Sequence, residues 1–125
     1  MSDDKPIRLL VVDDHPVLRE GLAALIGSQP DMTLVAEAAT GKDAVDLFKV
    51  HLPDVTIMDL RLPDMNGIAA ISAIREHSAN ARIIVLTTYL GDVQADRALK
   101  AGAYAFLLKA TLRTDLLDTI RAEPL

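Results

Sequence analysis

Cysteine and tryptophan are absent from the 125-residue sequence, and only two tyrosines and two phenylalanines are present. Without cysteine the chain can form neither a disulfide nor a thiolate metal site, which is typical of proteins of the reducing cytoplasm. No apolar run approaches the roughly 18 residues that a membrane helix needs. The first residues, Met-Ser-Asp-Asp-Lys-Pro, show no signal-peptide pattern. We therefore expect a soluble, cytoplasmic protein that makes no membrane contact.

The sequence also has fewer basic than acidic residues, 13 against 18, and its formal net charge is -5. A nucleic-acid binder usually shows a basic face, often with stacking aromatics. We therefore do not expect this chain to contact DNA directly.

Half of the residues are hydrophobic, and the length suits one continuous core. The sequence predicts a single domain over residues 1–125, with a folded core at about 6–122.

Short apolar runs alternate five times with longer amphipathic stretches. The pattern predicts strands at 7–12, 32–38, 55–58, 82–86 and 103–108, and helices at 16–28, 41–51, 67–77, 92–101 and 112–121. Pro16 suits a first helical turn, Thr40 with Asp43 and Asn66 suit helix starts, and Gly102 suits a helix end. This alternation predicts an α/β fold with a doubly wound parallel sheet. Right-handed crossovers leave few topologies, of which the flavodoxin-like order is one of two common ones.

Polar residues stand at the ends of four predicted strands, namely Asp13 and Asp14, Asp59, Thr87, and Lys109. The carboxyl ends of parallel strands share one edge of the sheet, and ligands bind outside that edge. Each residue alone has an ordinary structural explanation, such as a strand end, a helix cap or a solvated lysine. Their common position favours one shared site instead.

Carboxylates brought this close repel each other unless a cation lies between them. Oxygen ligands without histidine or cysteine suit Mg²⁺. A carboxylate beside Mg²⁺ can attack a phosphoryl donor and become an aspartyl phosphate. Lys109 can then neutralise phosphoryl charge, and the Thr87 hydroxyl can bind a phosphoryl oxygen.

Over essentially its whole length the sequence resembles a CheY-like receiver domain of two-component response regulators. The matching residues are Asp13 and Asp14, Asp59 in MDLRLPDMNG together with Pro63 and Gly67, Thr87 in VLTTY, and Lys109 in AGAYAFLLKA. The segments DDHPVLREGLAALI and LLKATLRTDLLDTIR most resemble the NarL/FixJ class, whose receivers usually precede a LuxR-type helix-turn-helix. The resemblance implies the flavodoxin-like strand order 2-1-3-4-5 with five helices.

The resemblance also implies roles for individual residues. Asp59 would be the phosphoacceptor, Asp14 a direct Mg²⁺ ligand and Asp13 a ligand through water. The backbone carbonyl of Arg61 would complete the protein ligands of the metal. Thr87 and Lys109 would contact the phosphoryl group, and Thr87 with Phe106, rather than Tyr104, would form the switch.

The function implied by the resemblance is signalling rather than metabolic catalysis. A sensor histidine kinase would supply the phosphoryl group, and the chain would catalyse only its own phosphorylation and dephosphorylation. The conformational change would control homodimerisation or an output domain. DNA would be reached only through a C-terminal domain that is not in this chain, and residues 123–125 are expected to begin the linker to it.

Three positions depart from the family pattern. Ala110 follows Lys109 where proline is common, and Thr88 follows Thr87 where a smaller residue is frequent. Phe106 has no hydroxyl, so switching would rest on packing.

Two other functions remain as alternatives. One is a pseudo-receiver that binds partners without phosphotransfer, against which the intact set of site residues argues. The other is an aspartate-nucleophile phosphatase of the haloacid dehalogenase type. That class has an acid two residues after the nucleophile, where this sequence has Arg61.

Overall fold

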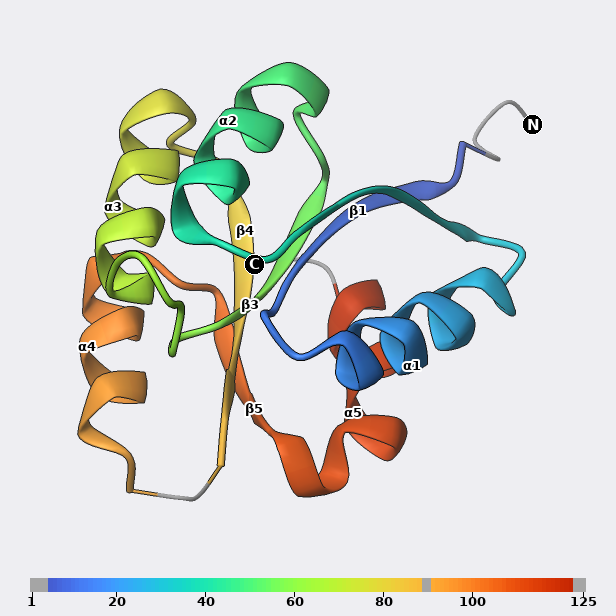
Figure 1. Ribbon diagram of the computed structural model, residues 1–125. Helices are drawn as coiled ribbons and strands as arrows, with labels where there is room; N and C mark the ends of the chain where they lie inside the picture. Colours follow the sequence, from blue (N-terminus) through green and yellow to red (C-terminus); the bar gives the residue numbers. More distant parts are fainter. Residues whose placement is uncertain (1–4, 89–90, 123–125) are drawn as a thin grey trace.

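Five strands form one parallel sheet in the order β2-β1-β3-β4-β5, and helices connect them (Figure 1). The computed structural model describes residues 5–88 and 91–122. The elements are β1 (Ile7–Val12), α1 (Pro16–Gly27), β2 (Met32–Ala38), α2 (Gly41–His51), β3 (Val55–Asp59), α3 (Gly67–His77), β4 (Arg82–Thr87), α4 (Val93–Ala101), β5 (Ala105–Leu108), the 3-10 turn η1 (Lys109–Thr111) and α5 (Leu112–Arg121). The predicted α/β fold and strand order are confirmed. Tyr89 and the expected linker start at 123–125 lie outside the described residues.

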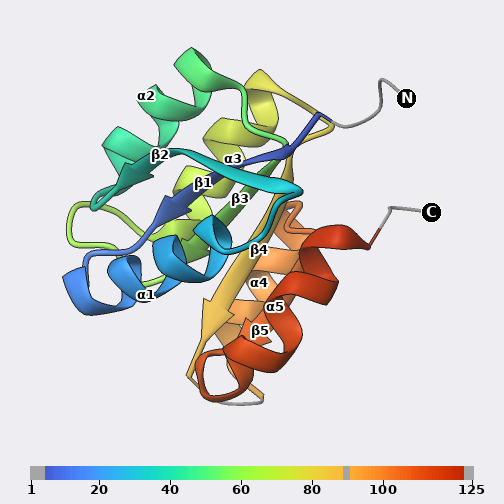
Figure 2. The same ribbon diagram turned by 90° about the vertical axis from the view of Figure 1, so that its right-hand side faces the viewer.

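The sheet is buried on both faces. Helices α1 and α5 cover one face, and α2, α3 and α4 cover the other (Figures 1 and 2). Within β1, Leu9 and Val11 pack toward α1 and α5, whereas Leu10 and Val12 pack toward the other three helices. Successive side chains of a strand point to opposite faces, so a strand covered on both sides must be apolar throughout. This explains why the strands appear in the sequence as uninterrupted apolar runs.

The four residues predicted to start or end helices do so in the structure. Pro16 opens α1. The hydroxyl of Thr40 accepts a hydrogen bond from the Asp43 amide, and the side chain of Asn66 accepts one from the Ile68 amide. Gly102 ends α4 at a φ of 118°, a left-handed conformation that glycine adopts without steric cost.

Two strands run further than their apolar patterns predict. Asp59 is the last residue of β3 and pairs with Leu86, and Thr87 is the last residue of β4 and pairs with Leu108. Polar residues can therefore take part in the ladder, because its hydrogen bonds are made by the backbone and not by the side chains. Consequently Asp59 and Thr87 sit on rigid strand ends rather than in loops.

Three other predicted boundaries were wrong by one or two residues. α1 ends at Gly27 instead of 28, and α4 begins at Val93, with Asp92 as its N-cap. β5 begins at Ala105 instead of 103, because the amide of Ala103 bonds back to Ala98 at the end of α4.

No peptide bond within 5–88 and 91–122 is cis, so the residue pair 109–110 is joined in trans. None of the helices in these ranges is long and apolar enough to cross a bilayer.

Candidate functional site

An acidic cluster lies at the carboxyl edge of the sheet. Val12 pairs with Met58 in the parallel ladder, so the residues that follow, Asp13 and Asp59, lie side by side. Ligand atoms of Asp13, Asp14, His15 and Asp59 all lie within 4.8 Å of one another. Asp13 and Asp59 are buried, whereas Asp14 and His15 are exposed. The structure thus brings together the three predicted carboxylates and adds a histidine that the sequence pattern did not single out.

The carboxylate of Asp13 is only half satisfied. Its Oδ1 accepts a hydrogen bond from the His15 amide at 2.7 Å and lies 2.9 Å from Nδ1 of the same residue. Its Oδ2 is buried and has no hydrogen-bond partner. Burying a charged oxygen without a partner is costly unless a cation compensates it. The donor set and this orphaned oxygen both fit a hard divalent cation.

Asp59 is held from two sides. Its Oδ2 accepts a hydrogen bond from Nζ of Lys109 at 2.7 Å, and its Oδ1 accepts one from the Arg61 amide at 3.0 Å. Lys109 reaches it from the turn that follows β5, fifty residues away along the chain. Nδ1 of His15 lies 4.0 Å from the same Oδ2. The carboxylate is therefore fixed by a charge-assisted bond beside the acidic cluster.

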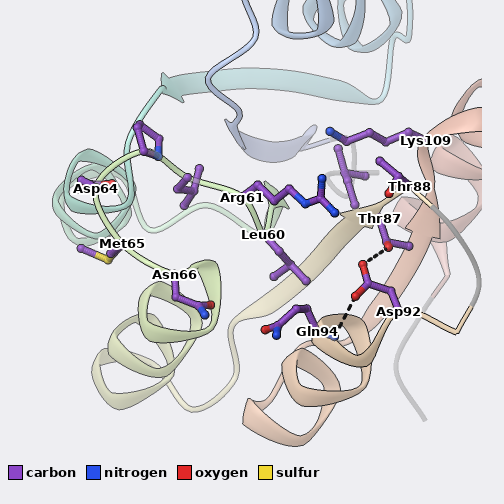
Figure 3. A pocket seen from close by; sticks show the side chains of 13 residues that line it. Leu60, Arg61, Asp64, Met65, Asn66, Thr87, Thr88, Asp92, Gln94 and Lys109 are labelled. Atoms are coloured by element: carbon purple, nitrogen blue, oxygen red, sulfur yellow. Dashed lines mark hydrogen bonds between the residues drawn. The ribbon is translucent and has the colours of Figure 1, made fainter.

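Thr87 occupies the neighbouring strand end and is buried. Its hydroxyl donates a hydrogen bond to Oδ2 of Asp92 at 2.7 Å, while Oδ1 of Asp92 accepts one from the Gln94 amide at 2.9 Å (Figure 3). These bonds, the hydroxyl first, hold the pKa of Asp92 below its ordinary value. The sequence pattern did not identify Asp92, although aspartate directly before a helix is a common N-cap.

A hollow of about 430 Å³ opens between the β3–α3 loop and the start of α4 (Figure 3). It is lined by residues 60–66, 86–88, 92, 94 and 109. Arg61 extends across it from the β3–α3 loop, and its charge also lowers the pKa of Asp92. Thr87 and Lys109 are therefore among the residues that line this hollow.

The β3–α3 loop, which carries Arg61, is tightly built. A Cβ on Gly67 would come within 2.7 Å of the Leu60 backbone, so only glycine fits there. Asp64 accepts hydrogen bonds from the amides of Gly41 and Lys42 at 2.7 and 2.9 Å, which fastens the loop to the first turn of α2. These contacts position the loop next to Asp59.

Phe106 and Tyr104 lie on opposite sides of the sheet. Phe106 pairs with Val85 and packs toward α2, α3 and α4. Thr87 is two residues beyond Val85, so it faces the same side as Phe106. Tyr104 packs on the other side and stacks on the guanidinium of Arg82 at 4.6 Å. Of the two aromatics, Phe106 is thus the one placed near the Thr87 side of β4.

Known proteins resemble this chain over most of its length. The family model described as "Response regulator receiver domain" matches residues 9–121. The nitrate/nitrite response regulator protein NarL of Escherichia coli K12 is 38% identical over 120 residues, which are 96% of this chain and 56% of that protein. The chain therefore spans about half the length of the curated relatives it matches.

Solved structures give the same result. The signal receiver domain of the response regulator NarL from Mycobacterium tuberculosis superposes with a TM-score of 0.85 at 33% identity, covering 95% of this chain and 99% of that one. A chain of the CheX-CheY-BeF3-Mg²⁺ complex from Borrelia burgdorferi has a TM-score of 0.85 at 29% identity, covering 93% and 87%. The chain belongs to the response regulator receiver domain family and is a receiver of the NarL/LuxR type.

Proposed function

We propose that this receiver takes a phosphoryl group onto Asp59 and catalyses its own phosphorylation and dephosphorylation. The observation that carries the proposal is the position of Asp59 at a buried strand end, 2.7 Å from Lys109 and beside Asp13, one oxygen of which has no partner. The ammonium group of Lys109 can exchange its hydrogen bond to the Asp59 carboxylate for one to a phosphoryl oxygen, because both groups lie within its reach. The intact set of site residues argues against a pseudo-receiver.

Mg²⁺ is the cation we assign to the acidic cluster. Asp14 would bind it directly, Asp13 through water, and Asp59 with the Arg61 backbone carbonyl would complete the protein ligands. When bound, the ion neutralises charge on phosphoryl oxygens in the transition state. The presence of Mg²⁺ and BeF3 in the Borrelia complex, a relative in fold and sequence, supports this choice.

The phosphoryl donor is a phosphohistidine of a sensor histidine kinase. A carboxylate oxygen of Asp59 forms the new bond to phosphorus while the bond from phosphorus to the imidazole nitrogen breaks, and the imidazole remains with the kinase. Lys109 then donates to one phosphoryl oxygen and the Thr87 hydroxyl to another. Hydrolysis by water returns the Asp59 carboxylate and releases inorganic phosphate.

The new charge, about -1.5 to -2 by analogy with other phosphorylated side chains, draws Thr87 toward Asp59. Phe106 moves into the space that Thr87 leaves, which changes the face made by α4, β5 and α5. This is supported by the placement of both side chains on one side of the sheet. The output is homodimerisation, or control of a C-terminal DNA-binding domain in a cytoplasmic regulator of about twice this length.

The test is labelling by acetyl phosphate with Mg²⁺, followed by intact-protein mass spectrometry. Wild type should gain the mass of one phosphoryl group, and Asp59→Asn should gain none because the amide is no nucleophile. Asp118→Asn, which changes an exposed aspartate of α5, should label like wild type. Undiminished labelling of Asp59→Asn would overturn the assignment. Size-exclusion chromatography of the labelled protein tests the proposed dimer.

A further inference from the structure

The hydroxyl of Thr87 has a partner on α4. It donates to Oδ2 of Asp92 at 2.7 Å, and the same carboxylate caps α4 through its other oxygen (Figure 3). We propose that Asp92 is a positioning residue that competes with the phosphoryl group for the Thr87 hydroxyl and so couples phosphorylation to the start of α4. This inference rests on the proposed phosphorylation of Asp59.

The competition follows from the chemistry of a hydroxyl group. Threonine has one hydroxyl hydrogen, so a donation to Asp92 and a donation to a phosphoryl oxygen exclude each other. Asp92 is a strong competitor because hydrogen bonds to an ionised acceptor are roughly twice as strong as neutral ones. The lowered pKa of Asp92, caused first by the Thr87 hydroxyl and next by the Gln94 amide, keeps this carboxylate ionised at neutral pH.

Release of Thr87 changes the start of α4. Oδ2 of Asp92 then loses its hydroxyl donor, while Oδ1 still accepts from the Gln94 amide. The carboxylate can turn about that remaining bond, and the first turn of α4 loses this hydrogen bond to the end of β4. This route needs no hydroxyl on the switch aromatic, and Phe106 has none.

The variant Asp92→Ser separates the two roles of the carboxylate. Serine is about as good an N-cap as aspartate. Its side chain is shorter, however, and its single oxygen accepts the hydrogen bond from the helix end, so it leaves no acceptor for Thr87. We expect Asp92→Ser to bind beryllofluoride with Mg²⁺ roughly three- to tenfold more tightly than wild type, as judged by isothermal titration calorimetry, because the competing bond is gone. Asp92→Asn should move in the same direction, because its one carbonyl oxygen caps the Gln94 amide and its amide nitrogen cannot accept the Thr87 hydrogen.

Two controls isolate the hydrogen bond from the loss of charge. Asp96→Ser removes an exposed carboxylate from the same turn of α4 and should leave the affinity for beryllofluoride at the wild-type value. In a Thr87→Ala background, Asp92→Ser should produce no further tightening. Amide exchange of Gln94 and Ala95 should quicken on beryllofluoride binding in wild type, because the capping carboxylate is then held by one hydrogen bond instead of two, but it should not quicken in Thr87→Ala.

The outcomes distinguish the two proposals. If wild type binds beryllofluoride and labels on Asp59 while Asp92→Ser and Asp92→Asn bind no more tightly, the coupling through Asp92 is wrong and the phosphoacceptor function stands. Equal tightening in Asp96→Ser, or in the Thr87→Ala background, also overturns the coupling, because charge alone then explains the effect. A wild type that neither binds nor labels overturns both.

Discussion

At the scale of single residues, Asp13 combines a satisfied oxygen with an unsatisfied one. Its Oδ1 accepts from the His15 amide, whereas Oδ2 is buried without a partner, and the carboxylates of Asp14 and Asp59 lie in the same cluster. Residues arranged for binding often reduce the stability of the empty protein, because the charge that attracts the ligand is uncompensated without it.

We predict that Asp13→Asn stabilises the Mg²⁺-free protein. The substitution keeps an oxygen for the His15 amide and replaces the orphaned oxygen with an amide group that can donate to Asp14 or Asp59. The free energy of unfolding in EDTA, measured with urea, should rise by about 1–3 kcal/mol. Asp118→Asn, which removes an exposed charge, should change it by less than about 0.5 kcal/mol. A destabilised Asp13→Asn would show that a favourable interaction already compensates the Asp13 carboxylate in the Mg²⁺-free protein, and would contradict the prediction.

At the scale of elements, Asp64 ties two segments together. It stands in the β3–α3 loop and accepts hydrogen bonds from two amides at the start of α2, where helices leave their amides unpaired. The amides of Lys42 and Gly41, in that order, hold the pKa of Asp64 below its ordinary value. The contact thus satisfies a helix end and positions the loop that follows Asp59.

This contact predicts a pH dependence of stability. Because the pKa is lower in the folded than in the unfolded protein, the ionised carboxylate stabilises the fold above the unfolded pKa of about 3.9. That contribution is lost as the pH falls through the folded value. Wild type should therefore be more stable than Asp64→Asn at pH 7, and the difference should shrink below about pH 4. Urea unfolding of both proteins between pH 7 and pH 3 tests this.

Asp43→Asn serves as the control for that series. It removes a carboxylate from the same turn of α2 without touching the two capped amides. Its stability difference from wild type should be the smaller of the two at pH 7. A difference for Asp64→Asn that is the same at pH 7 and pH 3 would contradict the prediction.

At the scale of the whole molecule, a cation at the sheet edge should stabilise the entire fold. Its proposed ligands come from the ends of the central strand β3 and its neighbour β1, and the site exists only when these strands pair. A ligand that binds the folded state alone raises the free energy of unfolding by RT ln(1 + [L]/Kd).

We predict that each tenfold rise in Mg²⁺ above its dissociation constant adds about 1.4 kcal/mol to the free energy of unfolding of wild type. Asp14→Asn should lose most of this dependence, because the direct ligand becomes a neutral amide. Denaturation in EDTA and at several Mg²⁺ concentrations, with ionic strength held constant by KCl, measures both. Equal dependence in the two proteins would show that Asp14 does not bind the metal.

Much of the fold could be predicted from the sequence because the information is local. A short, uninterrupted apolar run indicates a strand that is buried on both faces. Asn66 marks a helix start because its side chain accepts a backbone hydrogen bond, and Gly102 marks a helix end because glycine adopts a left-handed conformation. The extent of β3 and β4 could not be predicted in this way. Asp59 and Thr87 are polar, and only the neighbouring strand decides that their backbones continue the ladder.

The sequence by itself determined which residues stand at the strand ends, and therefore which carboxylates, hydroxyl and lysine meet at one edge of the sheet. Only the tertiary structure decided how these groups are paired. The bond from Thr87 to Asp92, the place of His15 beside Asp59 and the bonds from Asp64 to α2 all join different elements or loops. The alternation of strands and helices decides which residues end the strands. Hydrogen-bond partners instead depend on distances of a few ångströms, and these are determined by how the elements pack.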